Sequence, residues 1–268
     1  MGSPRFAGKV VVVTGGSSGI GRATVIRFAR EGAAVMIGDI NDDLGHALVD
    51  ELSDGKVAFQ KTDVSKEQEL VALMEAAVRQ FGALDILFSN AGLTAMGNTP
   101  DLSPDLWRRV IETDLSSVFY AARAAIPHMR QQGKGVIINN ASISGMMGDY
   151  GMVVYNAAKG GVVNYTRALA LDHARENIRV NAICPGAIDT PLFEGIKAVP
   201  KLYKDWMNLI PMGRIGTPEE IAGVVAFLAS DDASYMTGAI ITIDGGQTAS
   251  TGTPNFNAYL DDLKAQYN

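Results

Sequence analysis

The chain has a single cysteine, Cys184, among 268 residues, so it cannot form an internal disulfide or a cysteine-rich metal site. This scarcity is typical of proteins in the reducing cytosol, and we expect a cytoplasmic location. The three histidines, His46, His128 and His173, lack the spacing of metal ligands, and we expect no bound metal. No apolar run approaches the roughly 18 residues of a transmembrane helix, and residues 1–9 lack the apolar segment of a secretion signal. We therefore expect no association with a membrane.

The chain also lacks a surplus of positive charge. Its formal net charge is −6, and its Lys and Arg residues form no run, whereas a nucleic-acid binder normally presents a basic face. We therefore expect no nucleic-acid partner. The 29 Gly and 10 Pro follow no repeat, which excludes collagen and low-complexity linkers. Since 47% of the residues are apolar and 19% are charged, the chain can bury a sizeable core.

Short apolar runs alternate with longer amphipathic stretches along the chain. The runs predict strands at residues 10–13, 34–38, 57–60, 84–88, 136–139, 178–183 and 239–243. The stretches between them predict helices at residues 20–30, 40–52, 65–81, 104–132, 156–174 and 218–230, the third with Ser65 as its N-cap. Alternating strands and helices predict a parallel sheet, and runs apolar on both faces suit a sheet covered on both sides. We expect a single α/β domain, a Rossmann-type doubly wound parallel sheet of about seven strands with helices on both faces.

Two segments depart from this alternation. Residues 186–216 form a long insertion with three prolines between the sixth strand and the last helix, and such insertions are usually lids or binding loops. We therefore predict a catalytic domain over residues 1–246, with 186–216 as its substrate loop or lid. Residues 247–268 are predicted to be a C-terminal tail that is weakly helical at 257–266; it either packs on a neighbouring subunit or is a frayed end.

The loop after the first predicted strand is rich in glycine. Residues 14–21 read TGGSSGIG and open the first predicted helix. Glycine permits tight turns and close backbone approach, and a helix N-terminus presents free N–H groups to a phosphate. The alternative is an ordinary strand–helix turn, but the position after the first strand favours a dinucleotide site. The predicted cofactor contacts in this loop are Gly15, Ser17, Ser18, Gly19, Ile20 and Gly21.

Asp39 ends the second predicted strand, where a carboxylate can bind both ribose hydroxyls and would repel a 2′-phosphate. Neither the glycine-rich loop nor residues 40–41 supply a cation for such a phosphate, and Arg22 is expected to face elsewhere from its helix. We therefore predict NAD as the cofactor in preference to NADP. The alternative is that Asp39 is a turn residue at a strand end.

Tyr155 and Lys159 lie four residues apart at the start of a predicted helix and so share one helix face. A tyrosine ionises near pH 10, but a neighbouring ammonium and a cationic nicotinamide ring would favour the phenolate and lower its pKa. Tyr155 could then exchange a proton with a substrate hydroxyl or carbonyl. Ser142 follows the fifth predicted strand and could donate a hydrogen bond to the same substrate oxygen; alternatively, it is an ordinary loop serine.

Taken together, these motifs resemble the short-chain dehydrogenases/reductases over about residues 7–246. The matching motifs are TGGSSGIG at 14–21, Asp63-Val64, Asn90-Ala91-Gly92, Ser142, Tyr155 with Lys159, NAICPG at 181–186, and DGG at 244–246. The resemblance implies that Asp63 and Val64 contact adenine. It also implies further cofactor contacts from Asn90, Ala91, Gly92, Tyr155, Lys159, Pro185, Gly186, Ile188 and Thr190.

One position departs from the pattern of this family. The family usually has an asparagine in the fourth helix, in a motif like T-N-L, where it contributes to a water-linked proton relay through the lysine. This chain reads Thr113-Asp114-Leu115. We expect Asp114 to take the asparagine's place among the catalytic residues, either holding the relay water or pairing with Lys159, and pairing would raise the pKa of that lysine. A milder departure is Ser89, where the family often has asparagine.

The resemblance implies an NAD-dependent oxidoreductase that transfers a hydride between the cofactor and a secondary alcohol or ketone. It places substrate contacts at residues 93–98, 144–153 and 186–210, where many side chains are Met or other apolar residues. Such a lining suits a mid-sized apolar substrate, although these methionines could equally be core or interface residues. The alternatives are a 3-oxoacyl thioester reductase and a dinucleotide-binding regulatory protein without activity. The resemblance also implies a homotetramer that pairs through the helices near 104–132 and 153–175 and through the last strand and helix.

Overall fold

The computed structural model describes residues 4–53, 55–260 and 264. Seven strands form one sheet in the order β3-β2-β1-β4-β5-β6-β7, and every neighbouring pair is parallel. The strands are β1 (Val10–Thr14), β2 (Ala34–Asp39), β3 (Val57–Lys61), β4 (Ile86–Ser89), β5 (Gly135–Asn140), β6 (Ile178–Pro185) and β7 (Ile240–Ile243). The predicted α/β fold is confirmed.

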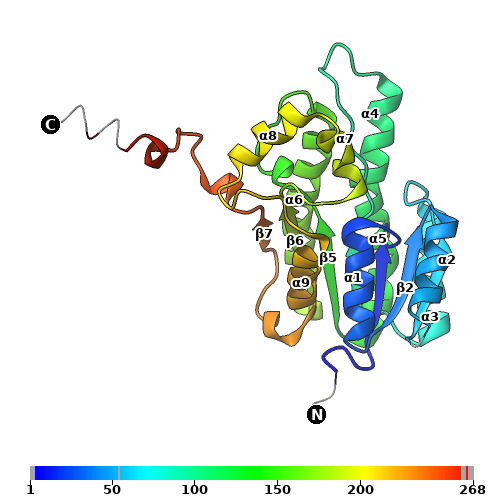
Figure 1. The fold of residues 1–268 in the computed structure, drawn as a ribbon. Helices are drawn as coiled ribbons and strands as arrows, with labels where there is room; N and C mark the ends of the chain where they lie inside the picture. The colour runs from blue at the N-terminus through cyan, green and yellow to red at the C-terminus, as the bar shows by residue number, and fades with distance from the viewer. Residues whose placement is uncertain (1–3, 54, 261–263, 265–268) are drawn as a thin grey trace.

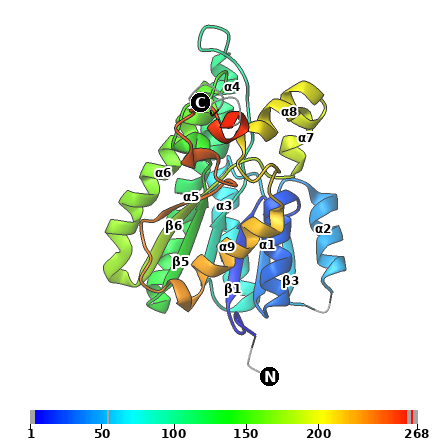
Figure 2. The same cartoon turned by 60° about the vertical axis from the view of Figure 1, so that its left-hand side comes forward.

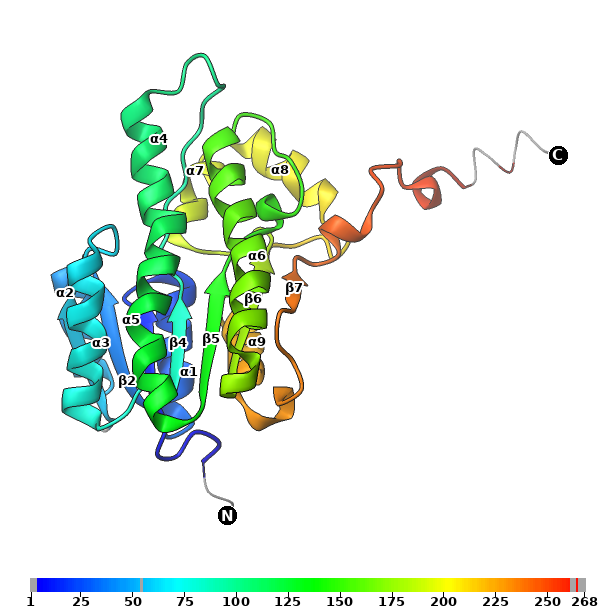
Figure 3. The same cartoon turned by 180° about the vertical axis from the view of Figure 1, so that it is seen from behind.

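Helices cover both faces of the sheet. On one face α1, α2 and α9 pack against the strands, and on the other face lie α3, α5 and α6 (Figures 1 and 3). The helices are α1 (Gly19–Arg30), α2 (Asp42–Glu51), α3 (Glu67–Phe81), α4 (Pro104–Ile111), α5 (Ser117–Gln132), α6 (Val153–His173), α7 (Glu194–Lys197), α8 (Pro200–Leu209) and α9 (Pro218–Ala229). No helix among the described residues is long and apolar enough to cross a membrane.

The core has two layers because the central strand is apolar on both faces. Side chains alternate across a strand, so Val10 and Val12 pack under α3 and α5, while Val11 and Val13 pack under α1 and α9. All four valines are at most 3% exposed. This two-sided burial explains why the strands read as continuous apolar runs.

The helix predicted over residues 104–132 is confirmed in its bounds, and it contains a π-helical turn, Glu112–Ser116, between α4 and α5 that was not predicted. One local prediction on the helices is wrong. Ser65 is not the N-cap of α3, which begins at Glu67 after Lys66. The Ser65 hydroxyl instead donates a hydrogen bond to Asp63 Oδ1 at 2.7 Å, because a short polar side chain readily bonds within its own turn.

The insertion between β6 and α9 contains α7 and α8, which lie beyond the carboxyl ends of the strands (Figures 1 and 2). Its own small core is built around Phe193, Trp206 and Ile210, and the rings of Phe193 and Trp206 meet edge to face with centroids 5.2 Å apart. The tail leaves the body after β7 and extends away from it (Figure 3). A short helical turn, Phe256–Tyr259, lies in the tail, and most of the helix predicted at 257–266 lies outside the described residues.

Candidate active site

The predicted site residues gather where the strand order reverses, between β1 and β4, at the carboxyl ends of the strands. In doubly wound sheets this switch point opens the ligand crevice. The glycine-rich loop joins β1 to α1 at this edge. At Gly15, whose φ is +62°, a Cβ would lie 2.8 Å from Ala91 Cα, and at Gly21 a Cβ would lie 2.0 Å from the Gly15 carbonyl oxygen. Only glycine fits these two positions, and the N-terminus of α1 has no side-chain cap.

The Asp39 carboxylate lies at the same loop. It accepts hydrogen bonds from the backbone N–H groups of Ser17, at 3.0 Å, and Asn41, at 2.9 Å. Arg22 faces away, as predicted, because its guanidinium pairs with Glu51 on α2. The sequence analysis did not predict a further cation near Asp39: Lys61 lies beside it on the neighbouring strand β3.

Asn90 holds the ends of three strands together. Its amide nitrogen donates to the carbonyls of Thr14 and Gly15, each at 3.0 Å, and its Oδ1 accepts from Asn140 at 2.9 Å. The side chain of Asn90 is therefore engaged with the protein itself. A Cβ on Gly92 would lie 2.9 Å from Asp114 Oδ2, so glycine at this position lets the loop after β4 close over that carboxylate.

The remaining predicted cofactor contacts border the same edge of the sheet. Asp63 and Val64 form the turn after β3, where the hydrogen bond from Ser65 holds the pKa of Asp63 below its usual value. Beyond β6, Thr190 reaches the glycine-rich loop, since a Cβ at Gly19 would lie 3.1 Å from Thr190 Cγ2. The segment after β6 thus lies against the glycine-rich loop at this edge of the sheet.

Ser142, Tyr155 and Lys159 come together between the end of β5 and the start of α6. Ser142 follows β5, is 8% exposed, and accepts a hydrogen bond from the Ser144 N–H at 3.1 Å. Tyr155 lies in the first turn of α6, and the Lys159 ammonium lies 5.6 Å from the centroid of its ring. The Ser142 hydroxyl proton takes no part in the bond from Ser144, and the Ser142 side chain also hydrogen-bonds Tyr155.

Asp114 completes this group from the π-helical turn. Its side chain is fully buried, and Oδ2 forms an ion pair with Lys159 Nζ at 3.2 Å. Its Oδ1 accepts a hydrogen bond from the Leu93 N–H at 2.9 Å, while Lys159 also donates to the Asn140 carbonyl at 3.0 Å. The predicted pairing of Asp114 with Lys159 is confirmed. Burial has the largest single effect and acts to lower the pKa of Lys159, but the charges of Asp114 and Tyr155 and the hydrogen bond with Asp114 together outweigh it, so the pKa is raised as expected.

The pKa of Tyr155 lies above the ordinary value of a tyrosine. Burial of the phenol raises it most, the Lys159 ammonium lowers it, the Asp114 carboxylate raises it, and a hydrogen bond with Ser142 lowers it. Among the protein's own groups, burial and Asp114 therefore outweigh Lys159. The predicted effect of the ammonium is confirmed in direction, since Lys159 acts to lower the pKa of Tyr155, but in the protein by itself burial outweighs it.

Known proteins share this architecture. A family model described as enoyl-(acyl carrier protein) reductase matches residues 15–248. The cis-4-hydroxycyclohexanecarboxylate dehydrogenase of Sinomonas cyclohexanicum is 45% identical over 249 residues, 91% of this chain and 98% of the relative. The 3-oxoacyl-[acyl-carrier-protein] reductase of Thermotoga maritima is 41% identical over 244 residues, 90% of this chain and 98% of the relative. The crystal structure of levodione reductase superposes with a TM-score of 0.87 at 38% identity and covers 92% of this chain and 100% of that chain.

The chain belongs to the short-chain dehydrogenase/reductase family. It is thus a member of an oxidoreductase family that uses a nicotinamide dinucleotide, and the residues present fit such a group. The glycine-rich loop leaves backbone N–H groups at the uncapped N-terminus of α1 for a pyrophosphate. Asp39 lies where a ribose would follow.

Three residues that organise this dehydrogenase site were not found from the sequence. Asn156 donates to the carbonyls of Ser144 and Met147, at 2.7 and 2.8 Å, and so ties the loop after Ser142 to α6. Asn140 supplies the carbonyl that receives Lys159. Gly145 packs directly on the backbone of α6. The asparagine pair that ends β5 was a usable signal, whereas Asn156 and Gly145 act through contacts that no sequence motif marks.

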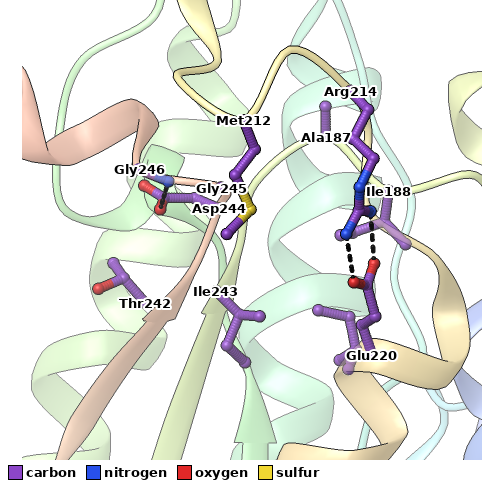
Figure 4. Close-up of a pocket in the computed structure, with 12 residues that line it drawn as sticks. Ala187, Ile188, Met212, Arg214, Glu220, Thr242, Ile243, Asp244, Gly245 and Gly246 are labelled. Atoms are coloured by element: carbon purple, nitrogen blue, oxygen red, sulfur yellow. Dashed lines mark hydrogen bonds and ion pairs between the residues drawn. The ribbon is translucent and has the colours of Figure 1, made fainter.

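A cavity of about 310 Å³ lies beside the site rather than at its centre (Figure 4). Arg214 and Glu220 form a two-pronged ion pair at its wall, with nitrogen–oxygen distances of 2.9 and 2.7 Å. Of the predicted site residues only Ile188 lines this cavity. Ser142, Tyr155 and Lys159 do not, so the cavity is not where the dehydrogenase chemistry takes place.

Proposed function

We propose that this dehydrogenase transfers a hydride between NAD and a mid-sized, largely apolar secondary alcohol or ketone, within a catalytic domain over residues 1–246. The observation that carries the proposal is the grouping of Ser142, Tyr155 and Lys159 at the crevice that the glycine-rich loop borders. The relative from Sinomonas is named for a secondary alcohol on a six-membered carbon ring that also carries a carboxylate, which supports a secondary alcohol as the substrate.

Each catalytic residue has one task in this scheme. A bound nicotinamide dinucleotide would supply or accept the hydride at the substrate carbon. The Tyr155 hydroxyl donates its proton to the carbonyl oxygen during reduction, and its phenolate accepts the proton of the alcohol during oxidation. Ser142 donates a hydrogen bond to the same oxygen. Lys159, held by Asp114 and the Asn140 carbonyl, keeps a positive charge beside the phenol.

The preference for NAD over NADP follows from the charges around Asp39. A 2′-phosphate would meet this carboxylate, and the nearby cations are engaged, because Arg22 pairs with Glu51 and Lys61 lies 3.7 Å from Asp42. We expect a higher kcat/KM with NAD than with NADP. Asp39→Asn should reduce the ratio of these two constants by raising kcat/KM with NADP. Equal use of both cofactors by the wild type would contradict this preference.

The reduction of 3-oxoacyl thioesters is the second candidate, supported by the relative from Thermotoga. Three of the four cations in the insertion pair with carboxylates of this protein instead of leaving a free basic surface for an acidic carrier. Lys197 pairs with Asp189 and Glu194, Lys201 with Asp205, and Arg214 with Glu220 on α9. This pairing favours a small apolar substrate.

The deciding experiment is a substrate panel followed through the absorbance of the reduced cofactor. Secondary alcohols, the matching ketones and a 3-oxoacyl thioester are assayed with both dinucleotides, with Tyr155→Phe as the control. We expect turnover of apolar alcohols and ketones, with a loss of about 10²- to 10⁴-fold in Tyr155→Phe. Binding of NADH without turnover of any compound would favour a regulatory protein instead.

We further propose that the protein is a homotetramer in a reducing cytosol. The outer helices expose apolar side chains that a second copy would cover, among them Trp107, Phe119 and Leu171, which are 42%, 45% and 81% exposed. The strand β7 ends the sheet and leaves one edge unpaired in the single chain. The tail exposes Phe256, which is 60% exposed, and we expect it to pack on a neighbouring subunit. Light scattering of the full chain and of a chain truncated at Gln247 tests both points.

A further inference from the structure

Asp114 is held at two points by the protein. The π-helical turn Glu112–Ser116 carries it into the interior, and such turns often occur at functional sites. One carboxylate oxygen accepts the N–H of Leu93 at 2.9 Å, and the other lies 3.2 Å from Lys159 Nζ. The Asp114 and Lys159 side chains are 0% and 4% exposed. Water therefore does not screen the pair effectively. Burial raises the pKa of the Asp114 carboxyl, while the charge of Lys159 and the hydrogen bond from Leu93 act to lower it.

The charges that face Tyr155 come from three elements. Lys159 lies one turn along α6, Asp114 comes from the π-helical turn, and Asp149 comes from the exposed loop before α6. The groups that face Lys159 are Asp114, Tyr155 and the neutral thiol of Cys184 on β6. A lone ammonium would favour the phenolate of Tyr155, whereas the Asp114 carboxylate opposes it. The Asp114 carboxylate consequently cancels part of the effect that the Lys159 ammonium has on the phenol.

We propose that Asp114 is a positioning residue that, through its ion pair with Lys159, keeps Tyr155 protonated to a higher pH and so moves the pH at which alcohol oxidation sets in upward. This inference rests on the proposed function. In reduction, a hydride from NADH forms the new C–H bond, the carbonyl π electrons move to oxygen, and that oxygen takes the proton of Tyr155. Oxidation runs the same step backwards and needs the Tyr155 phenolate to accept the alcohol proton. A group that holds the phenol protonated therefore raises the pH at which the phenolate needed for oxidation becomes available.

The experiment compares the wild type with Asp114→Asn. Asparagine keeps an oxygen that can accept the Leu93 N–H but removes the charge. The control is Asp149→Asn, which also removes one carboxylate near Tyr155, but from an exposed loop where solvent screens it. For each protein, kcat/KM is measured against pH in both directions. Tyr155 is also titrated without substrate, from the phenolate absorbance difference between each protein and its Tyr155→Phe counterpart.

In Asp114→Asn we expect two shifts to lower pH: the pH at which kcat/KM for oxidation rises, and the midpoint of the Tyr155 phenol titration. Both shifts should be much smaller in Asp149→Asn. Below both midpoints, the phenolate fraction in Asp114→Asn should exceed that of the wild type by about tenfold for each pH unit of displacement, and oxidation should be faster by up to that factor. Superimposable phenol titrations would overturn the proposal, because they would mean that Asp114 is protonated and acts as an amide would. An equal shift in Asp149→Asn would also overturn it. If no substrate is turned over, the proposed function fails, while the titration still decides the role of Asp114.

Discussion

The replacement of Gly145 by alanine tests how the loop that carries Ser142 is held on α6. A Cβ at Gly145 would lie 2.5 Å from the Lys159 carbonyl oxygen and 2.7 Å from its carbon, whereas ordinary contacts begin at 3.4 Å. The φ of Gly145 is not positive, so alanine adds steric overlap without backbone strain. Because both partners are backbone, the loop and the helix must separate by about 1 Å, a displacement of the size that can cost about 100-fold in rate.

We expect Gly145→Ala to lower kcat/KM by about 10- to 100-fold, since Ser142 and Tyr155 move apart. The overlap should also lower the free energy of unfolding by about 1–3 kcal/mol, the usual cost of overpacking. Urea unfolding at a fixed protein concentration and steady-state kinetics measure the two effects. Gly148→Ala is the matched control: it lies in the same loop, and a Cβ there would meet nothing within 4 Å. Wild-type kinetics and stability in Gly145→Ala would refute the reasoning.

Two further predictions concern groups away from the reacting atoms. Burial raises the pKa of the Cys184 thiol to about 11, so thiol reagents should leave it unmodified in the native protein and modify one thiol per chain in urea; equal labelling in both states would contradict its burial. Hydrogen bonds from Arg130 and His173 hold the pKa of Glu176 at about 2, below its usual 4.5. A depressed pKa stabilises the fold above the unfolded value, so the advantage of the wild type over Glu176→Gln in the urea midpoint should be present at neutral pH and fade as the pH falls from about 4.5 toward 2. A difference that does not depend on pH would argue against this pairing.

The strands were well predicted because their physical signal is local. A strand covered on both faces needs apolar side chains on both, and the runs at residues 10–13 and 34–38 coincide with β1 and β2 to within a residue. The ends of the helices were predicted less accurately than the strands. Serine is a good N-cap by type, yet Ser65 bonds to Asp63 and the helix begins at Glu67, because the competing partner lies only two residues away in the same turn.

The kind of fold and the chemical groups of the site follow from the amino-acid sequence alone. Apolar periodicity settled the alternation of strands and helices, while the glycine-rich loop and the Tyr155–Lys159 spacing marked the crevice. How these groups affect one another depends on the tertiary structure. Asp114 is far from Lys159 in sequence, and only the π-helical turn buries it 3.2 Å from the lysine ammonium. Proton affinities depend on burial and on charges brought together from distant segments, so the raised pKa of Tyr155 could not be read from the Tyr155–Lys159 motif.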